Sequence, residues 1–178
     1  MKKTFLIAGF GGQGVQTLGT LLAIAATEAG YKSTFLPAYG GEMRGGTSNC
    51  TTTISDRFIG DPNAETYDMV IALSAPAYAK FSSKVKEGGT LVYNCSLITP
   101  AAPVEGREMI ALDLAAMVDE IGNPLSLNAI LFGFLIGLTD EIPDDTGKAV
   151  LRQKLGKNEK YREMNDRAFE LGFSKSKE

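Results

Sequence analysis

The chain has 178 residues, of which 44% are hydrophobic and 22% are charged, which is typical of a globular protein with a sizeable core. Its formal net charge is −3 and its basic residues form no stripe, which argues against nucleic acid as a partner. It has no histidine, and its two cysteines stand outside any C-x-x-C pair, which argues against a metal site or iron–sulfur cluster held by this chain alone.

The two cysteines, Cys50 and Cys95, are predicted to be reduced, buried thiols. The apolar run at residues 4–8 is too short for the core of a signal peptide, and the longest apolar run, residues 129–138, is too short to span a bilayer. We therefore expect a cytoplasmic protein without a membrane partner.

Residues 1–36 predict a strand, a tight turn, a helix and a second strand. The apolar run 5–8 ends at Gly9, residues 15–29 carry leucine and alanine at helical spacing up to Gly30, and residues 33–36 are typical of a strand. This order predicts a βαβ unit with a parallel sheet and a right-handed crossover.

The remaining elements continue the alternation of strands and helices. Strands are predicted at residues 49–54, 69–73, 90–94 and 109–112, with a hairpin turn at 55–57 and a short return strand at 58–59. Helices are predicted at residues 76–85, 113–121 with Asp113 as N-cap, 125–138, 144–155 and 159–171 with Gly172 as C-cap. The fold class is therefore α/β, a Rossmann-like, doubly wound, mainly parallel sheet with helices on both faces and a C-terminal helical tail. No linker is visible, so residues 1–178 are predicted to form a single domain.

The predicted helix at residues 125–138 is apolar nearly all round. Ala129, Gly133 and Gly137 recur at four-residue spacing, which gives the helix one side that admits close contact. The pattern predicts either tight packing within the chain or a subunit interface.

A glycine-rich turn, Gly9-Phe10-Gly11-Gly12-Gln13-Gly14, follows the first strand and opens the first helix. It fits the G-x-G-x-x-G pattern, and free N–H groups at a helix start favour an anion. Three interpretations stay open: contact with an anion or cofactor, packing alone, and an NAD site. The last is disfavoured because the second strand ends in residues 36–39 with neither an acidic residue for the ribose nor an arginine for a 2′-phosphate.

A second glycine-rich segment, residues 39–49, holds Glu42 and Arg44 between two glycine pairs. The planar guanidinium of Arg44 suits a phosphate or carboxylate, and Glu42 is placed to orient it. A doubly wound sheet would bring this segment beside the first glycine turn, at the edge where ligands bind. The alternative is a solvated loop with an incidental ion pair.

These two segments together resemble the gamma subunit, or gamma domain, of 2-oxoacid:ferredoxin oxidoreductases. The resemblance rests on residues 9–15, Tyr39 and residues 42–49, and it continues through residues 54–56, Asp68, residues 88–89, Asn94, Ser96, Asn128, Asn165 and residues 168–169. The Glu-Met-Arg-Gly-Gly-Thr element at residues 42–47 is far more specific than the glycine turn. Gly41 departs from the family pattern, where proline or another residue is expected.

The resemblance implies a multi-subunit enzyme that decarboxylates a 2-oxoacid on thiamine diphosphate with Mg, passes electrons through iron–sulfur clusters to ferredoxin, and releases an acyl-CoA. This chain has no Gly-Asp-Gly thiamine motif and no cluster cysteines, so the expected carriers of these cofactors are alpha, beta and possible delta (ferredoxin-like) subunits. The chain itself is expected to be inactive alone and able to form a homodimer when isolated. Its implied role is to pack against the thiamine-binding subunits and shape the cleft for CoA and the 2-oxoacid.

No catalytic residue is assigned to this chain. The predicted cofactor-binding residues are Gly9, Gly11, Gly12, Gln13, Gly14, Glu42, Arg44, Gly45, Gly46, Thr47 and Asn49. Of these, Gly11, Gly12 and Gln13 are expected to line the cleft with backbone N–H groups, and Arg44 to meet a CoA phosphate or a partner carboxylate. A free-standing NAD(P)-dependent enzyme and a non-enzymatic interaction module remain as alternatives. Pyruvate, 2-oxoglutarate and 2-oxoisovalerate all remain as substrates, with the Glu-Met-Arg form favouring the last two.

Overall fold

The computed structural model describes residues 1–39, 47–156 and 158–178. Its strands are β1 (Lys2–Phe10), β2 (Lys32–Tyr39), β3 (Thr47–Ser55), β4 (Tyr67–Ala72), β5 (Val85–Asn94) and β6 (Glu108–Leu112). Its helices are α1 (Val15–Glu28), α2 (Ala75–Phe81), α3 (Leu114–Ile121), α4 (Leu127–Leu138), α5 (Asp144–Leu155) and α6 (Glu159–Lys175), with short 3₁₀ turns η1 (Ser82–Lys84) and η2 (Pro124–Ser126).

The strands form one sheet in the order β2-β3-β1-β4-β5-β6. Each neighbouring pair among β1, β4, β5 and β6 is parallel, whereas β3 is antiparallel to both β1 and β2. This confirms the predicted α/β class, a mainly parallel, Rossmann-like sheet. β1 and β2 run parallel to each other, as the predicted βαβ unit requires, but β3 lies between them.

The position of β3 also changes which strands pair as neighbours in the sequence. β2 and β3 pair antiparallel from Lys32 with Ser55 to Tyr39 with Ser48, so β3 pairs with the strand that precedes it. The predicted turn at residues 55–57 and return strand at 58–59 are wrong, because the chain leaves the sheet after Ser55. Phe58 has no strand to pair with and is 89% exposed.

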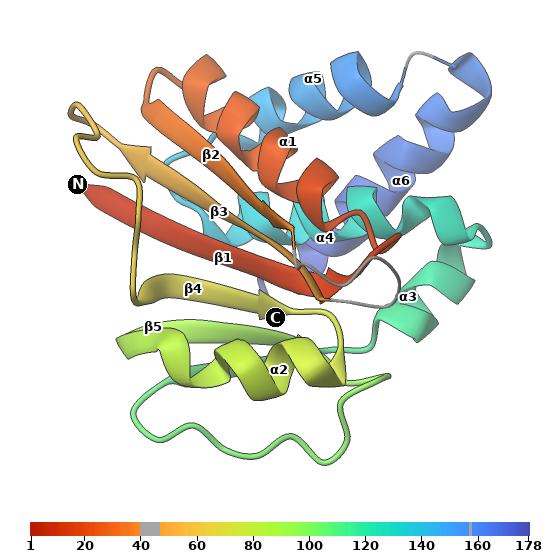
Figure 1. Cartoon of the computed structure of the whole chain (residues 1–178). Coiled ribbons are helices and arrows are strands. Elements are labelled where there is room, and N and C mark those ends of the chain that lie inside the picture. Colours follow the sequence, from red (N-terminus) through yellow and green to blue (C-terminus); the bar gives the residue numbers. More distant parts are fainter. Residues whose placement is uncertain (40–46, 157) are drawn as a thin grey trace.

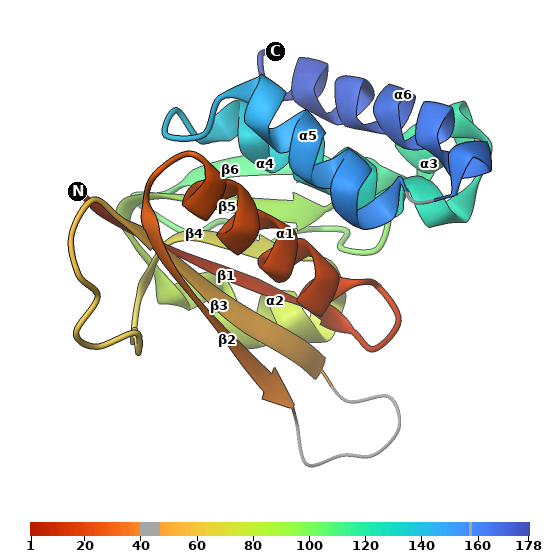
Figure 2. The ribbon, with the colours of Figure 1, turned by 90° about the horizontal axis from the view of Figure 1, so that it is seen from above.

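Helices cover both faces of the sheet, as Figures 1 and 2 show, with α1 and α5 on one side and α2 on the other. The two faces take alternate residues of β1 because successive side chains of a strand point to opposite faces. Phe5 and Ile7 join the core under α1 and α4, whereas Leu6 and Ala8 join the core under α2.

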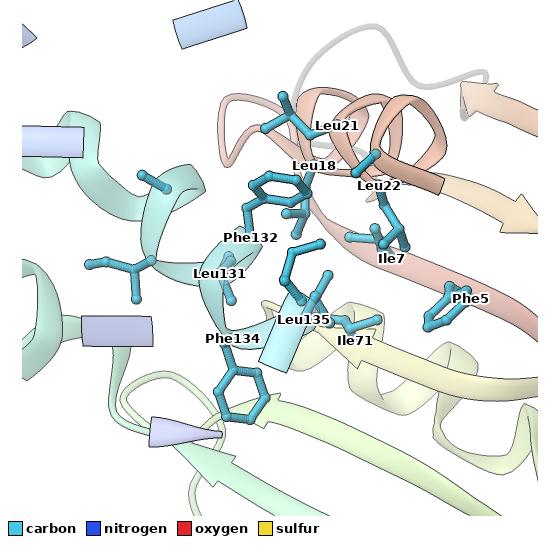
Figure 3. Packing of buried hydrophobic residues seen from close by; sticks show 14 of the residues in the cluster. Phe5, Ile7, Leu18, Leu21, Leu22, Ile71, Leu131, Phe132, Phe134 and Leu135 are labelled. Atoms are coloured by element: carbon cyan, nitrogen blue, oxygen red, sulfur yellow. The ribbon is translucent and has the colours of Figure 1, made fainter. Parts of the chain in front are cut away.

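The larger core lies between the sheet, α1 and α4. Figure 3 shows Phe132 and Leu135 of α4 among Leu18, Leu22 and Ile71. The middle of α4 is buried on every side, which is the result that its all-round apolarity predicts.

The close contact of α4 is made within the chain, with α6. A Cβ on Gly133 would meet the backbone of Phe169, and one on Gly172 would meet the backbone of Ile130. The prediction of Gly172 as a C-cap is therefore wrong: α6 continues to Lys175 and is capped at Ser176, and Gly172 is the contact point between the two helices. This packing of α6 favours the single-domain prediction.

The remaining boundaries follow the local signals to different degrees. Asp113 caps α3, accepting a hydrogen bond from the Ala116 N–H at 3.1 Å, as predicted. α5 begins and ends at the predicted residues. The predicted helix at residues 76–85 is divided into α2, which ends at Phe81, and the 3₁₀ turn η1, which ends at Lys84 before β5 begins.

The two cysteines differ in burial. Cys50 is fully buried under α1, and burial raises the pKa of its thiol to about 12. Cys95 is only half-buried, so the prediction of a buried thiol is right for Cys50 and wrong for Cys95.

No single helix in the described part of the chain has the length and apolarity to cross a membrane. The segments Leu114–Ile121 and Pro124–Leu138 reach that length and apolarity only when they are taken together, and the chain bends by 118° between them.

The first residues of β1 and β4 are joined through the carboxylate of Asp68. It accepts hydrogen bonds from the Thr4 N–H at 2.7 Å and the Thr4 hydroxyl at 2.8 Å, and the Lys86 ammonium lies at 2.9 Å. Burial by itself would raise the pKa of Asp68, but the hydrogen bonds from Lys86 and Thr4 outweigh it and hold the pKa below its usual value.

Replacement of Asp68 by asparagine is expected to lower the free energy of unfolding by about 1 kcal/mol at pH 7, since the carboxylate is partly exposed. A depressed carboxyl pKa contributes stability above the pKa of the unfolded chain and loses it as pH falls through the folded value. Urea denaturation at pH 7 and below pH 4 checks this. The difference between wild type and Asp68→Asn should shrink at the lower pH, and an undiminished difference there would contradict the charge argument.

Candidate functional site

The candidate site lies at the edge where the parallel strands β1, β4 and β5 end. The glycine turn joins β1 to α1 at this edge, which is where ligands bind in open α/β sheets. Phe10 pairs with Thr47 and Tyr39 pairs with Ser48, so both flanks of the second glycine-rich segment reach the same edge. Glu42, Arg44, Gly45 and Gly46 lie outside the described residues, and their predicted roles stay predictions.

Gly11 and Gly12 form the open part of the turn. Both are exposed, and a Cβ on either would have no atom within 4 Å. Gly12 has a φ of 94°, which only glycine adopts readily. Within the part of the chain that the structure describes, no acceptor takes the N–H of either residue, so both can donate to a ligand.

Gln13 is placed differently from its prediction. Its N–H donates to the Phe10 carbonyl at 3.2 Å and is therefore occupied within the turn. Its side-chain amide is occupied as well, because Oε1 accepts from the Phe10 N–H at 2.6 Å and Nε2 donates to the Leu73 carbonyl at 3.2 Å. The geometry therefore contradicts the prediction that the Gln13 N–H lines the cleft, because this N–H is already hydrogen-bonded.

Gly9 and Gly14 make room for neighbours inside the chain. A Cβ on Gly9 would lie 2.5 Å from Gln13 Oε1 and 3.0 Å from the Leu73 Cβ. A Cβ on Gly14 would overlap the side-chain amide of Asn128, on the first turn of α4. The absence of a side chain at Gly14 therefore lets α4 lie close to the glycine turn.

Gln16 is a site residue that the sequence does not reveal. Its Nε2 donates to Ser48 Oγ at 3.0 Å and to the Asn49 carbonyl at 2.9 Å, so it ties the first turn of α1 to the start of β3. Of the predicted residues here, Asn49 offers its carbonyl to Gln16, and Thr47 pairs with Phe10 beside the turn. A lone glutamine in a helix start carries no signal of such a contact.

Two buried side-chain oxygens near the turn lack hydrogen-bond donors among the described residues. Gln16 Oε1 and Asn128 Oδ1 have no hydrogen-bond partner among the described residues. Buried acceptors are normally paired with protein or water. The region beside Gly14 therefore has acceptor capacity that a bound molecule or an ordered water would use.

The carboxylate of Asp113 lies farther along the same edge, directly after β6. Ser96 Oγ donates to Asp113 Oδ1 at 2.7 Å and accepts from the Ala115 N–H at 3.0 Å, so the two side chains together cap α3. The hydrogen bond from Ser96 is the main reason that the pKa of Asp113 is lowered. An anionic ligand is therefore favoured at the glycine turn and disfavoured at the end of β6.

Three large apolar side chains are exposed at this edge. Phe10 on the glycine turn is 38% exposed, Leu97 after β5 is 53% exposed and Leu125 before α4 is 66% exposed. We refer to Phe10, Leu97 and Leu125 as the apolar rim. Across residues 1–39, 47–156 and 158–178, the acidic and cysteine side chains include no group of three that could hold a metal ion.

A mainly parallel sheet with an open glycine turn at its carboxyl edge defines the class of the molecule, a Rossmann-like α/β protein. The chain belongs to the pyruvate ferredoxin/flavodoxin oxidoreductase family, whose family model matches residues 4–175. This confirms the family that the two glycine-rich segments indicate.

The chain is similar to curated relatives over nearly its whole length. It is 33% identical over 97% of its length to the ketoisovalerate oxidoreductase subunit VorA of Methanothermobacter thermautotrophicus, but it spans only 36% of that protein. It is 30% identical to the 2-oxoglutarate synthase subunit KorC of Methanocaldococcus jannaschii, over 100% of this chain and 96% of that one.

Solved structures agree. The keto/oxoacid ferredoxin oxidoreductase gamma subunit from Geobacter sulfurreducens superposes with a TM-score of 0.88 at 26% identity, covering 99% of this chain and 97% of that one. The 2-oxoglutarate:ferredoxin oxidoreductase from Magnetococcus marinus, solved with 2-oxoglutarate, coenzyme A and succinyl-CoA bound, also gives 0.88 at 26% identity, covering 99% of this chain and 31% of that chain.

Proposed function

We propose that this chain is the gamma subunit of a 2-oxoacid:ferredoxin oxidoreductase. The enzyme would convert a 2-oxoacid and CoA to an acyl-CoA and CO₂, with the electrons passing to ferredoxin. The observation that carries the proposal is the end-to-end match with the Geobacter sulfurreducens gamma subunit, which leaves almost no part of either chain unaligned. The similarity to KorC, which extends over 96% of that protein, supports the same proposal.

The glycine turn is the part of this chain that suits CoA. A phosphate of CoA is an anion, and the exposed N–H groups of Gly11 and Gly12 lie where α1 begins, at the positive end of its dipole. The bare backbone admits close approach, since a Cβ at either position would meet nothing within 4 Å. CoA supplies the thiol that accepts the acyl group, and the role of this chain is to hold and orient it. Arg44 would add a guanidinium from the second glycine-rich segment.

The apolar rim supports a partner at the same edge. Phe10 ends β1, Leu97 follows β5 and Leu125 precedes α4, and all three are exposed. Exposed apolar side chains beside the proposed ligand site would suit a surface that another subunit covers. We propose alpha and beta subunits as those partners, with a ferredoxin-like delta subunit in the same complex. Thiamine diphosphate, Mg and the iron–sulfur clusters would be held by these partners.

The substrate is proposed to be 2-oxoglutarate or 2-oxoisovalerate. The relatives VorA and KorC are named for ketoisovalerate and 2-oxoglutarate respectively, and both match nearly all of this chain. No observation favours the NAD(P)-dependent alternative, because β2 reaches the site edge as Leu36-Pro37-Ala38-Tyr39, without a carboxylate for a ribose.

Isolation of the complex tests the assembly. The chain is tagged in its native host, purified without oxygen, and the accompanying proteins are identified by mass spectrometry. Partner chains that carry thiamine diphosphate and iron–sulfur clusters are the expected result. A chain that purifies without partners at every salt concentration used would refute the proposal.

A further inference from the structure

The glycine turn has little of its own to hold it in one conformation. Gly11 and Gly12 lack side chains, and no side chain caps the start of α1 at Gly14. Consecutive glycines lose more conformational freedom on folding than other residues do, so the turn needs external contacts to keep its N–H groups oriented. The side chain of Gln13 makes two hydrogen bonds, one within the turn and one to a residue outside it.

The amide of Gln13 joins the glycine turn to the end of β4. Oε1 accepts from the Phe10 N–H at 2.6 Å, inside the turn. Nε2 donates at 3.2 Å to the carbonyl of Leu73, which directly follows β4 and precedes the N-cap of α2, Ser74. One planar side chain thus connects the loop after β1 with the loop after β4.

The surroundings are shaped for this amide. Leu73 is 1% exposed, and its own N–H donates to the Ala8 carbonyl at 2.8 Å, so the acceptor is fixed to the sheet. Gly9 leaves the space that Oε1 occupies, because a Cβ there would lie 2.5 Å away. Side-chain amide bonds to a rigid backbone hold orientation better than bonds to a mobile partner.

We propose that Gln13 is a positioning residue, whose amide crosslinks the glycine turn to the β4–α2 junction and so orients the Gly11 and Gly12 N–H groups toward the ligand. This deepens the proposed function, since the ligand in question is the CoA phosphate. Gln13 does not touch the ligand in this role; it acts through the turn that does.

The test measures backbone hydrogen exchange in the full chain without ligand, together with CoA kinetics in the complex. Gln13→Met keeps the length of the side chain and removes both hydrogen bonds. Exchange is expected to become about tenfold faster at the hydrogen-bonded N–H groups of Phe10 and Gln13 and also to rise at residues 73–75, where the Leu73 N–H is hydrogen-bonded. In the complex, the KM for CoA should rise while kcat stays within a factor of about two.

Two variants complete the design. Gln13→Glu keeps an acceptor for the Phe10 N–H but faces the Leu73 carbonyl with a carboxylate, so faster exchange is expected mainly at residues 73–75; it also carries the test if Gln13→Met does not fold. Gln153→Met makes the same substitution on the exposed face of α5 and should match wild type throughout.

Unchanged exchange at residues 73–75 in both Gln13 variants would overturn the crosslink. Faster exchange with an unchanged KM for CoA would overturn the positioning role. The proposed function is tested separately by Gly11→Ala, which leaves Gln13 in place. An unchanged KM for CoA in Gly11→Ala would contradict CoA binding at the glycine turn, whatever the hydrogen exchange of the Gln13 variants.

Discussion

Replacement of Gly133 by alanine should lower the free energy of unfolding by about 3 kcal/mol, because the added methyl overpacks the contact between α4 and α6. The Cβ would lie 2.8 Å from the Phe169 carbonyl carbon and 2.9 Å from its Cα. These are backbone atoms in the middle of a helix, so the two helices must separate. The better helix propensity of alanine returns only about 1 kcal/mol.

Urea denaturation followed by circular dichroism measures the effect. Gly60→Ala is the matched control, since a Cβ there has nothing within 4 Å and should leave stability unchanged. Gly172→Ala approaches the same contact from α6 and should cost a comparable amount. Equal midpoints for Gly133→Ala and Gly60→Ala would show that the helices are not in close contact.

Replacement of Gly11 by alanine is expected to raise the KM for CoA about tenfold, equivalent to about 1.4 kcal/mol of binding energy. The methyl group projects into open space in the free chain, and the backbone of Gly11 is not in the left-handed region. Folding should therefore be unaffected, and the cost appears only when a ligand approaches the N–H groups.

The complex assembled with Gly60→Ala is again the control, because that position shares the openness of Gly11 away from the glycine turn. Steady-state kinetics with CoA varied at saturating 2-oxoacid gives the two constants. A KM for CoA that is the same in both variants would contradict a ligand at the glycine turn.

The sequence predicts those parts of the fold whose signal is local. Asp113 marks the start of α3, and the limits of α5 follow from its amphipathic pattern. Strand order is not local: the threonines of β3 predict a strand, but its insertion between β1 and β2 depends on pairing with both. In the sequence, Gly172 has the pattern of a C-cap. Its contact with Ile130, which is distant in the sequence, is visible only in the structure.

The site divides in the same way. The free N–H groups of Gly11 and Gly12 agree with the glycine pattern, which requires only a strand, a turn and a helix in succession. Gln13 bonds to the carbonyl that follows β4, Gln16 bonds to the start of β3, and Asn128 of α4 lies against Gly14. No periodicity in the sequence reports these contacts. A glutamine in a glycine motif is therefore naturally mistaken for a ligand residue when its actual partner is the backbone of a neighbouring strand.

The most direct test of the proposed function is the activity of the isolated complex. Reduction of a viologen dye is measured without oxygen, with 2-oxoglutarate and 2-oxoisovalerate offered in turn, with and without CoA, and with this chain present or removed. Reduction that requires one of these 2-oxoacids, CoA and this chain is the predicted result. Two results would contradict the proposed function. In one, the complex reduces the dye equally well without this chain; in the other, the complex does not reduce the dye when either 2-oxoglutarate or 2-oxoisovalerate is supplied.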